Sequence, residues 1–214
     1  MNPNLVALSL TAIALLSSLP AQAFEPADLA RLQETKQCQN CDLAGADLSG
    51  LDLSRAELRF ADLSGANLRG TNLRQAALRG ADLTQADLRE ADLTQVSFRS
   101  ADLTDADLSG AVLTNVDLST SVLDGANFTN ADLTRAIFMT ARSLVGTNFS
   151  QALLQRTNLA GLDLREAIFD GTQFSETNLT LSNLEGIVLR DTSLDSTFTC
   201  GATLPDGTRA PNCP

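Results

Sequence analysis

Two groups of residues in this chain could carry chemistry, namely four cysteines and a large set of carboxylates. Cys38 and Cys41 form a Cys-Xaa-Xaa-Cys motif, which is the spacing that thiol–disulfide oxidoreductases use. The chain contains no histidine, and this excludes Ser–His and Cys–His nucleophilic dyads. Redox chemistry at Cys38 and Cys41 is therefore one hypothesis. No βαβ pattern surrounds the motif, so a structural disulfide is the favoured interpretation, and free or metal-bound thiols are a further alternative.

The carboxylates dominate the charge of the chain. Asp and Glu number 26 against 15 Lys and Arg, which gives a formal net charge of −11. This sign argues against binding to nucleic acid phosphates. Residues 102–132 hold six aspartates and no basic residue. We take these six as a candidate interaction patch for a basic protein partner: Asp102, Asp105, Asp107, Asp117, Asp124 and Asp132.

A repeat of five residues positions these groups. From Leu43, every fifth residue is Leu or Phe through Phe138. One inserted residue near Ser143 shifts the frame, and the series then runs from Leu144 to Leu194. The residue two before each of these centres is usually small, and the residue between them is often Asp or Asn. The unit is Ala-(Asp/Asn)-Leu-Xaa-Xaa, and the insertion predicts a local bulge.

A period of five excludes the usual secondary structures. A step of five turns an α-helix by roughly 140° and moves to the opposite face of a strand, so neither keeps the centres together. A short extended piece followed by a corner does so, with Ala and Leu inside and Asp, Ser, Thr and Arg outside. This predicts an all-β solenoid. Its outward carboxylates would be equivalent, whereas an acid–base pair needs two carboxylates in different environments.

The five-residue runs that begin at Ala46, Ala61 and Ala81 read Ala-Asp-Leu-Ser-Gly or Ala-Asp-Leu-Thr-Gln and resemble the pentapeptide repeat proteins. The resemblance covers roughly residues 41–196. It implies a right-handed quadrilateral β-helix with four pentapeptides per coil and about eight coils. Two series that recur at twenty residues, once the insertion is discounted, agree with four sides per coil: Arg59, Arg79 and Arg99, and Phe128, Phe149 and Phe169.

Both ends of such a solenoid need a cap. Residues 24–40 are predicted to form an N-terminal capping helix, with helical residues from Pro26 to Gln37. Residues 41–196 form the β-helix and residues 197–214 a turn-rich tail. The cysteines divide into Cys38 with Cys41 at one end and Cys200 with Cys213 at the other. Because nearly eight coils separate the pairs, we expect two local disulfides, the second of which closes the tail.

The N-terminus has the features of an export signal. Leu5 to Leu19 is an uncharged apolar run, and Ala21-Gln22-Ala23 follows it as a small-Xaa-small pattern. This predicts a signal peptide over residues 1–23, cleaved between Ala23 and Phe24 and leaving no membrane attachment. An uncleaved membrane anchor is the alternative. Residues 32–43 resemble the opening of exported cyanobacterial pentapeptide repeat proteins, which implies the periplasm or the thylakoid lumen.

These features together predict a non-enzymatic exported scaffold or protein-interaction module. We assign no catalytic, cofactor-binding or metal site, because the aspartate ladder lacks the Gly-Gly-Xaa-Gly-Xaa-Asp repeat of calcium-binding β-rolls. The partner is expected to be a basic protein, and a weak homodimer is a further hypothesis. Some members of the resembled family act as acidic mimics of DNA that bind type II topoisomerases, so DNA mimicry is an alternative function. Apolar residues replace polar ones at six outward positions and suggest a small contact patch: Val112, Val122, Ile137, Leu153, Ile168 and Val188.

Overall fold

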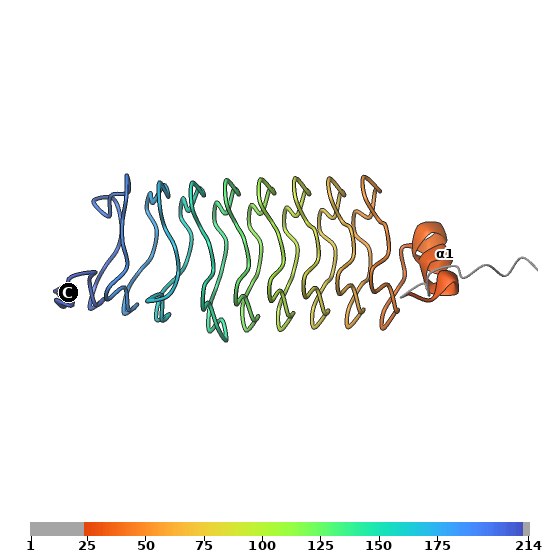
Figure 1. Cartoon of the computed structure of the whole chain (residues 1–214), viewed down its shortest axis with the longest axis horizontal. Helices are drawn as coiled ribbons and strands as arrows, with labels where there is room; N and C mark the ends of the chain where they lie inside the picture. Colours follow the sequence, from red (N-terminus) through yellow and green to blue (C-terminus); the bar gives the residue numbers. More distant parts are fainter. Residues whose placement is uncertain (1–23, 212–214) are drawn as a thin grey trace, which may run out of the picture.

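The computed structural model describes residues 24–211. These residues form a rod of stacked coils with one helix, α1, at its N-terminal end (Figure 1). The predicted signal peptide, including Ala23, and the C-terminal Cys213 lie outside the described residues. Phe24, on the other side of the predicted cleavage point, packs against the core of the rod.

Parallel pairing between residues twenty apart sets the coil. Asp42 pairs with Asp62, and Asp62 pairs in turn with Asp82 and Asp82 with Asp102. Three further columns start at Asp47, Asp52 and Gln37, so that each coil contains four pentapeptides. Each pentapeptide contributes one paired residue, at the Asp/Asn position, except those of Val188 and Ser193, which form no bridge, and no continuous strand forms within residues 24–211. The extended piece expected from the sequence is therefore reduced to a single bridge residue between two corners.

The four columns define four sides of the rod, which we number in chain order. Each side comprises its bridge residues and the two corner residues that follow each centre. The bridge residues of side 1 begin Asp42, Asp62, Asp82; those of side 2, Asp47, Asn67, Asp87; those of side 3, Asp52, Asn72, Asp92; and those of side 4, Glu57, Ala77, Ser97.

The inward positions form one continuous core along the rod. The centre residues and the small residues two before them are almost all buried, as Ala46 and Leu48 are with no exposed surface. Phe128, Phe149 and Phe169 stack face to face in successive coils, with ring centroids 5.2 Å apart at both steps and interplanar angles of 6° and 5°. This confirms the stacking that the twenty-residue series predicted.

The corners close with a backbone hydrogen bond and a left-handed residue. At the first corner the amide of Ala46 donates to the carbonyl of Leu43 at 3.0 Å, and Gly45 has a φ of 68°. The same position is left-handed when it is not glycine, as in Gln85 with a φ of 58°. A positive φ at the third residue is the mark of a type II turn, which explains why glycine recurs there.

Helix α1 (Pro26–Thr35) covers the first coil. Pro26 starts the helix, where its missing N–H is not needed, and Leu32 is fully buried beneath it. Lys36 adopts a left-handed conformation, and its amide donates to the carbonyl of Leu32 at 2.9 Å, which ends the helix. The prediction of a helix through Gln37 was therefore two residues too long, because Gln37 already pairs with Glu57.

The C-terminal end continues the coil beyond the predicted boundary at residue 196. Phe198 pairs with Asn178 and Thr203 with Asn183, both at the twenty-residue spacing. The chain then reverses, and Arg209 pairs with Thr203 in the antiparallel sense. This short hairpin covers the last edge of the coil. Residues 197–203 thus belong to the rod, although they lack the Ala-Asp-Leu pattern.

The inserted residue forms the predicted bulge. In regular coils one bridge residue both donates and accepts, as when Asp102 donates to Ala81 and accepts from Leu83. At the insertion two residues share this role, because Arg142 donates to Ser121 at 2.8 Å and Ser143 accepts from Leu123 at 3.1 Å. Two residues opposite one define a β-bulge.

The bulge also opens the next step of side 1. Within the described residues, neither the amide of Leu144 nor that of Gly146 donates to the following coil, and Ser143 does not pair with Asp163. A cavity of about 200 Å³ lies at this gap, lined by residues 141–145, Asp163 and Glu166. The other three sides keep their ladders between the same two coils. Between these two coils, the ladder is therefore interrupted on side 1 alone.

Candidate interaction surface

The Cys-Xaa-Xaa-Cys motif forms a disulfide beneath α1. Cys38 and Cys41 are joined, with their Cα atoms 5.2 Å apart, and both are essentially fully buried. The guanidinium of Arg31 lies 2.7 Å from Cys41 Sγ and 3.0 Å from the carboxylate of Asp28, so the helix covers the sulfurs. Reactive thiols that exchange with protein substrates are partly exposed, and this pair is not.

The second predicted disulfide lies partly outside the described residues. Cys200 is disulfide-bonded, and the described residues contain no free cysteine. Cys213 is not among the described residues, so its pairing with Cys200 stays a prediction. Gly201, next to Cys200, donates its amide to the carbonyl of Pro211 at 3.2 Å, which brings residue 211 back to the last coil.

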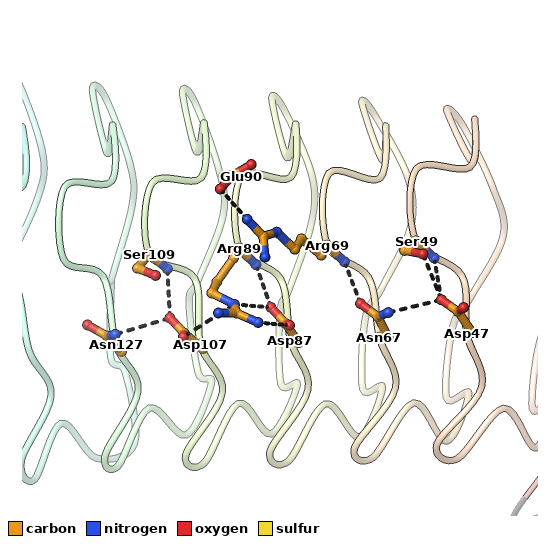
Figure 2. A network of polar contacts seen from close by, with 10 residues as sticks. All are labelled: Asp47, Ser49, Asn67, Arg69, Asp87, Arg89, Glu90, Asp107, Ser109 and Asn127. Carbon is orange, nitrogen blue, oxygen red and sulfur yellow. Dashed lines mark hydrogen bonds and ion pairs between the residues drawn. The ribbon is translucent and has the colours of Figure 1, made fainter.

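The aspartates at the bridge positions are corner caps. Asp47 Oδ1 accepts hydrogen bonds from the amide and the hydroxyl of Ser49, at 3.2 and 2.7 Å. Figure 2 shows the same arrangement repeated along side 2, where the amide of Arg69 donates to Asn67 Oδ1 and that of Ser109 to Asp107 Oδ1. The hydrogen bonds from Ser49 hold the pKa of Asp47 below its ordinary value. Asp and Asn thus recur because their side chains mimic a backbone turn.

Ion pairs tie neighbouring coils together on side 2 (Figure 2). Arg89 Nη2 lies 2.5 Å from Asp87 Oδ2, and Arg89 Nε lies 3.7 Å from Asp107 Oδ2 in the next coil. Arg69 reaches Glu90 at 2.8 Å. The hydrogen bond from Arg89 lowers the pKa of Asp87. Asp87, Glu90 and Asp107 of this side are therefore ion-paired within the rod.

The six aspartates of the candidate patch lie on different sides. Each falls in a column set by the pairing at twenty residues, so neighbours in sequence point in different directions. Side 1 holds Asp102, Asp105 and Asp124; side 2 holds Asp107, side 3 holds Asp132 and side 4 holds Asp117. The structure therefore does not bring the six together into one patch. Sequence proximity was the wrong criterion, because the chain changes side every five residues.

Side 1 holds further carboxylates that are far apart in the sequence and that the predicted patch did not include. Among bridge and corner residues 42–201, with the inserted Arg142 set aside, side 1 carries nine carboxylates and one arginine. Side 2 carries six carboxylates and three arginines, and side 3 carries five carboxylates and four arginines. Side 4 carries two carboxylates and three arginines. The nine are Asp42, Asp62, Asp82, Asp102, Asp105, Asp124, Asp163, Glu166 and Glu185. Recurrence of Asp at twenty residues from Asp42 to Asp102 was the signal in the sequence.

The carboxylates of side 1 also lack counter-ions. Asp163 pairs with Arg165 at 2.5 Å, and within residues 24–211 the other eight form no ion pair. Sides 2, 3 and 4 each contain at least two ion pairs, such as Arg74–Asp92 at 3.1 Å and Arg99–Asp117 at 3.3 Å. The negative field of the rod is therefore concentrated on side 1.

Comparison with known families decides what this architecture is. The family model for pentapeptide repeats matches in eight copies, at residues 37–75, 76–115, 101–138 and 143–180. The chain belongs to the pentapeptide repeat family. Pentapeptide repeat proteins form right-handed quadrilateral β-helices and are in general non-enzymatic structural or interaction modules.

Several solved pentapeptide repeat structures resemble the chain. HetL, involved in heterocyst differentiation regulation in Nostoc sp. strain PCC 7120, is 27% identical over 81% of this chain and 91% of its own, with a TM-score of 0.31. Rfr23 from the cyanobacterium Cyanothece 51142 is 25% identical over 56% and 96%, with a TM-score of 0.38. A protein of the Arabidopsis thaliana thylakoid lumen is 31% identical over 55% and 68%, with a TM-score of 0.24. Curated protein sequences give no match.

Neither a metal-ligating cluster nor a membrane-spanning helix occurs among residues 24–211. In the part of the chain that the structure describes, no three His, Cys, Asp or Glu side chains are grouped to hold a metal ion. Within residues 24–211 no helix combines the length and apolar character needed to cross a bilayer. What the sides do differ in is charge, and that difference is the basis for assigning a function.

Proposed function

We propose that this pentapeptide repeat protein is an exported, non-enzymatic scaffold that binds a basic protein partner through side 1. In this proposal the chain coils as a right-handed quadrilateral β-helix of about eight coils, and side 1 is its docking surface. The observation that carries the proposal is the row of carboxylates without counter-ions on side 1, on a rod whose other three sides each hold at least two ion pairs.

The geometry of side 1 suits a partner with regularly spaced cations. Asp42, Asp62, Asp82 and Asp102 occupy one column of paired residues, so they recur at the spacing of adjacent strands, about 4.8 Å. Like charges this close raise each other's potential, and a lysine- or arginine-rich surface relieves that repulsion on binding. Asp82 is exposed, and Asp42, Asp62 and Asp102 are half-buried at the surface. Salt screens charges that solvent reaches, so the affinity should fall as the ionic strength rises.

Export is supported by the N-terminal sequence. The apolar run from Leu5 to Leu19 and the Ala21-Gln22-Ala23 pattern are typical of a cleaved signal. We propose the periplasm or the thylakoid lumen as the destination, and we propose that Cys213 closes a disulfide with Cys200 in that oxidising compartment. The partner would then be a protein of the same compartment.

A matched pair of variants tests the docking surface. The first replaces Asp62, Asp82 and Asp102 on side 1 by Asn, and the second replaces Asp52, Asp92 and Asp132 on side 3 by Asn. Both remove three negative charges at the same repeat position, and Asn keeps the Oδ1 acceptor that caps the corner, as Asn67 does naturally. Affinity capture of the mature protein from its own compartment should lose the basic partner with the side 1 variant and keep it with the side 3 variant. Equal loss with both would contradict docking on side 1.

DNA mimicry is the second candidate, because a row of unpaired carboxylates also suits a protein that binds DNA. The two candidates differ in their target. A DNA mimic would inhibit supercoiling by DNA gyrase, and the side 1 variant would relieve that inhibition. If the mature protein does not inhibit gyrase, the result contradicts DNA mimicry. A basic protein of the same compartment then remains the proposed target of side 1.

A further inference from the structure

The C-terminal half of side 4 differs from every other surface of the rod. Between residues 137 and 201 none of its bridge or corner residues is charged, although each of the other three sides carries charges over the same coils. Its bridge residues are Ile137, Asn158, Asn178 and Phe198, and they form one column. Depletion of charge is the compositional mark of the central part of a protein interface.

Large apolar side chains stand out from this surface. Met139 is 56% exposed, Leu181 is 62% exposed and Phe198 is 55% exposed, while Ile137 at the other end of the column is 39% exposed. Ala160 and Gly161 occupy the corner between them, and the two polar bridge residues of the stripe, Asn158 and Asn178, are uncharged. Three steps of about 4.8 Å separate Ile137 from Phe198, which gives the stripe a length of about 14 Å.

The side-chain amides of Asn158 and Asn178, at the middle of the stripe, have hydrogen-bond donors that no protein group accepts among the described residues. Asn158 Oδ1 accepts from the amide of Ala160 at 3.1 Å, and Asn178 Oδ1 accepts from that of Thr180 at 3.0 Å. The Nδ2 groups of Asn67, Asn72 and Asn127 donate to an aspartate of the preceding coil, as Asn127 does to Asp107, because an aspartate precedes them in the column. Asn148 and Asn183 resemble Asn158 and Asn178 in lacking such a bond among the described residues. Within residues 24–211 no protein acceptor serves the Nδ2 of Asn158 or Asn178. Carboxamides are self-complementary, since each can donate and accept.

We infer that a second copy of this chain binds here, so that two rods pair antiparallel through the C-terminal halves of their side 4. A two-fold axis between the second and third rungs of the column sets Asn158 against the partner's Asn178 and Ile137 against the partner's Phe198. The same patch then serves both copies, as an isologous interface requires. The acidic side 1 of each rod remains available to the basic partner proposed above.

Charge favours the antiparallel arrangement over the parallel one. The N-terminal half of side 4 carries Arg59, Arg79 and Arg99 in successive coils. Parallel rods would place each of these arginines opposite its own copy, and Arg79 has no ion pair among the described residues. Antiparallel rods centred on Asn158 and Asn178 direct the two arginine rows away from each other, past the ends of the contact.

The size of the patch sets the strength of the contact. Stable interfaces bury about 800 Å² on each partner, which is much more than a stripe about 14 Å long on one side of the rod offers. The net charge of −11 on each copy adds a long-range repulsion that salt screens. We therefore expect a weak dimer whose population rises with protein concentration and with ionic strength.

Charge variants at the two asparagines test the contact and its direction. Asn158→Lys with Asn178→Asp places opposite charges across an antiparallel interface and should keep the dimer. Asn158→Lys with Asn178→Lys places like charges there and should raise the dissociation constant by about tenfold or more. Val188→Glu, on side 2, removes an apolar side chain of similar exposure and should change nothing. Sedimentation equilibrium measures all four proteins, and circular dichroism checks that each is folded.

Three outcomes would overturn the inference. A wild-type protein that stays monomeric at every concentration and salt level shows that no such contact exists. Dimers of equal strength in the wild type and the double-lysine variant place the contact elsewhere on the rod. Loss of the dimer in the Lys–Asp variant as well as in the double-lysine variant excludes the antiparallel pairing of Asn158 with Asn178.

Discussion

Val122 pairs with Ser143, twenty-one residues further along the chain, whereas Asp102 pairs with Val122 at the regular spacing of twenty. The extra residue, Arg142, donates its amide to Ser121 and so takes over half of the role of the bridge residue. The ladder on side 1 is then lost at the next step, where the amides of Leu144 and Gly146 donate to no backbone carbonyl of residues 24–211. A single insertion thus weakens one side of one coil and leaves the other three intact.

Deletion of Arg142 should stabilise the protein. With the spacing restored to twenty, Leu144 and Gly146 can donate to the carbonyls of Asp163 and Arg165 and close the gap. Each backbone hydrogen bond contributes about 1 kcal/mol, so we expect the free energy of unfolding to rise by about 1–2 kcal/mol. Urea denaturation followed by circular dichroism measures the change. Deletion of Gln85, in a regular corner, is the control and should destabilise the fold strongly.

Replacement of Phe149 by Leu should cost more than the same change at Phe98. The ring of Phe149 stacks between those of Phe128 and Phe169, at 5.2 Å from each, while Phe98 is equally buried and has no ring contact among the described residues. Each aromatic pair adds about 0.5–1.5 kcal/mol beyond area burial. We expect a loss of about 2–3 kcal/mol at Phe149 and about 1 kcal/mol at Phe98 in the same denaturation assay. Equal losses would show that the stack adds nothing.

Acid should weaken the first coils through Asp52. The hydroxyl and amide of Ser54 and the ammonium of Lys36 lower the pKa of this carboxyl from 3.8 to about 2. A folded-state pKa below the unfolded value means that the contribution to stability is complete above pH 3.8 and is lost as the pH falls toward 2. Asp52→Asn should therefore flatten the pH dependence of the denaturation midpoint in this window. A slope unchanged by the substitution would contradict the assignment.

Most of the fold could be predicted because one side-chain pattern repeats with little variation. The inward Leu and Ala positions, the glycine-rich corners and the bulge near Ser143 all follow from a period of five and one insertion. The helix was placed correctly at Pro26 but ended too late, because the left-handed conformation of Lys36 leaves no mark in the sequence. The C-terminal limit was set too early, since Phe198 and Thr203 pair through backbone groups that any residue provides.

The candidate surface was harder to predict, because it depends on residues that are far apart in the chain. Asp102 and Asp107 are close in sequence and lie on adjacent sides, whereas Asp102 and Asp82 are twenty residues apart and are paired. The missing counter-ions of side 1 could not be read from composition either. Arg89 serves Asp87 and Asp107 only because a coil brings all three to one side.

The sequence by itself determined which residues face inward and which face outward, because a hydrophobic residue at every fifth position permits only a repeated corner. It also determined the family, through the Ala-Asp-Leu runs. Only the tertiary structure decided which outward residues share a side, where the ladder of side 1 breaks, and that Arg31 covers the disulfide of Cys38 and Cys41. The physical reason is that the period of five acts locally, while charge neutralisation and exposure depend on neighbours one coil away.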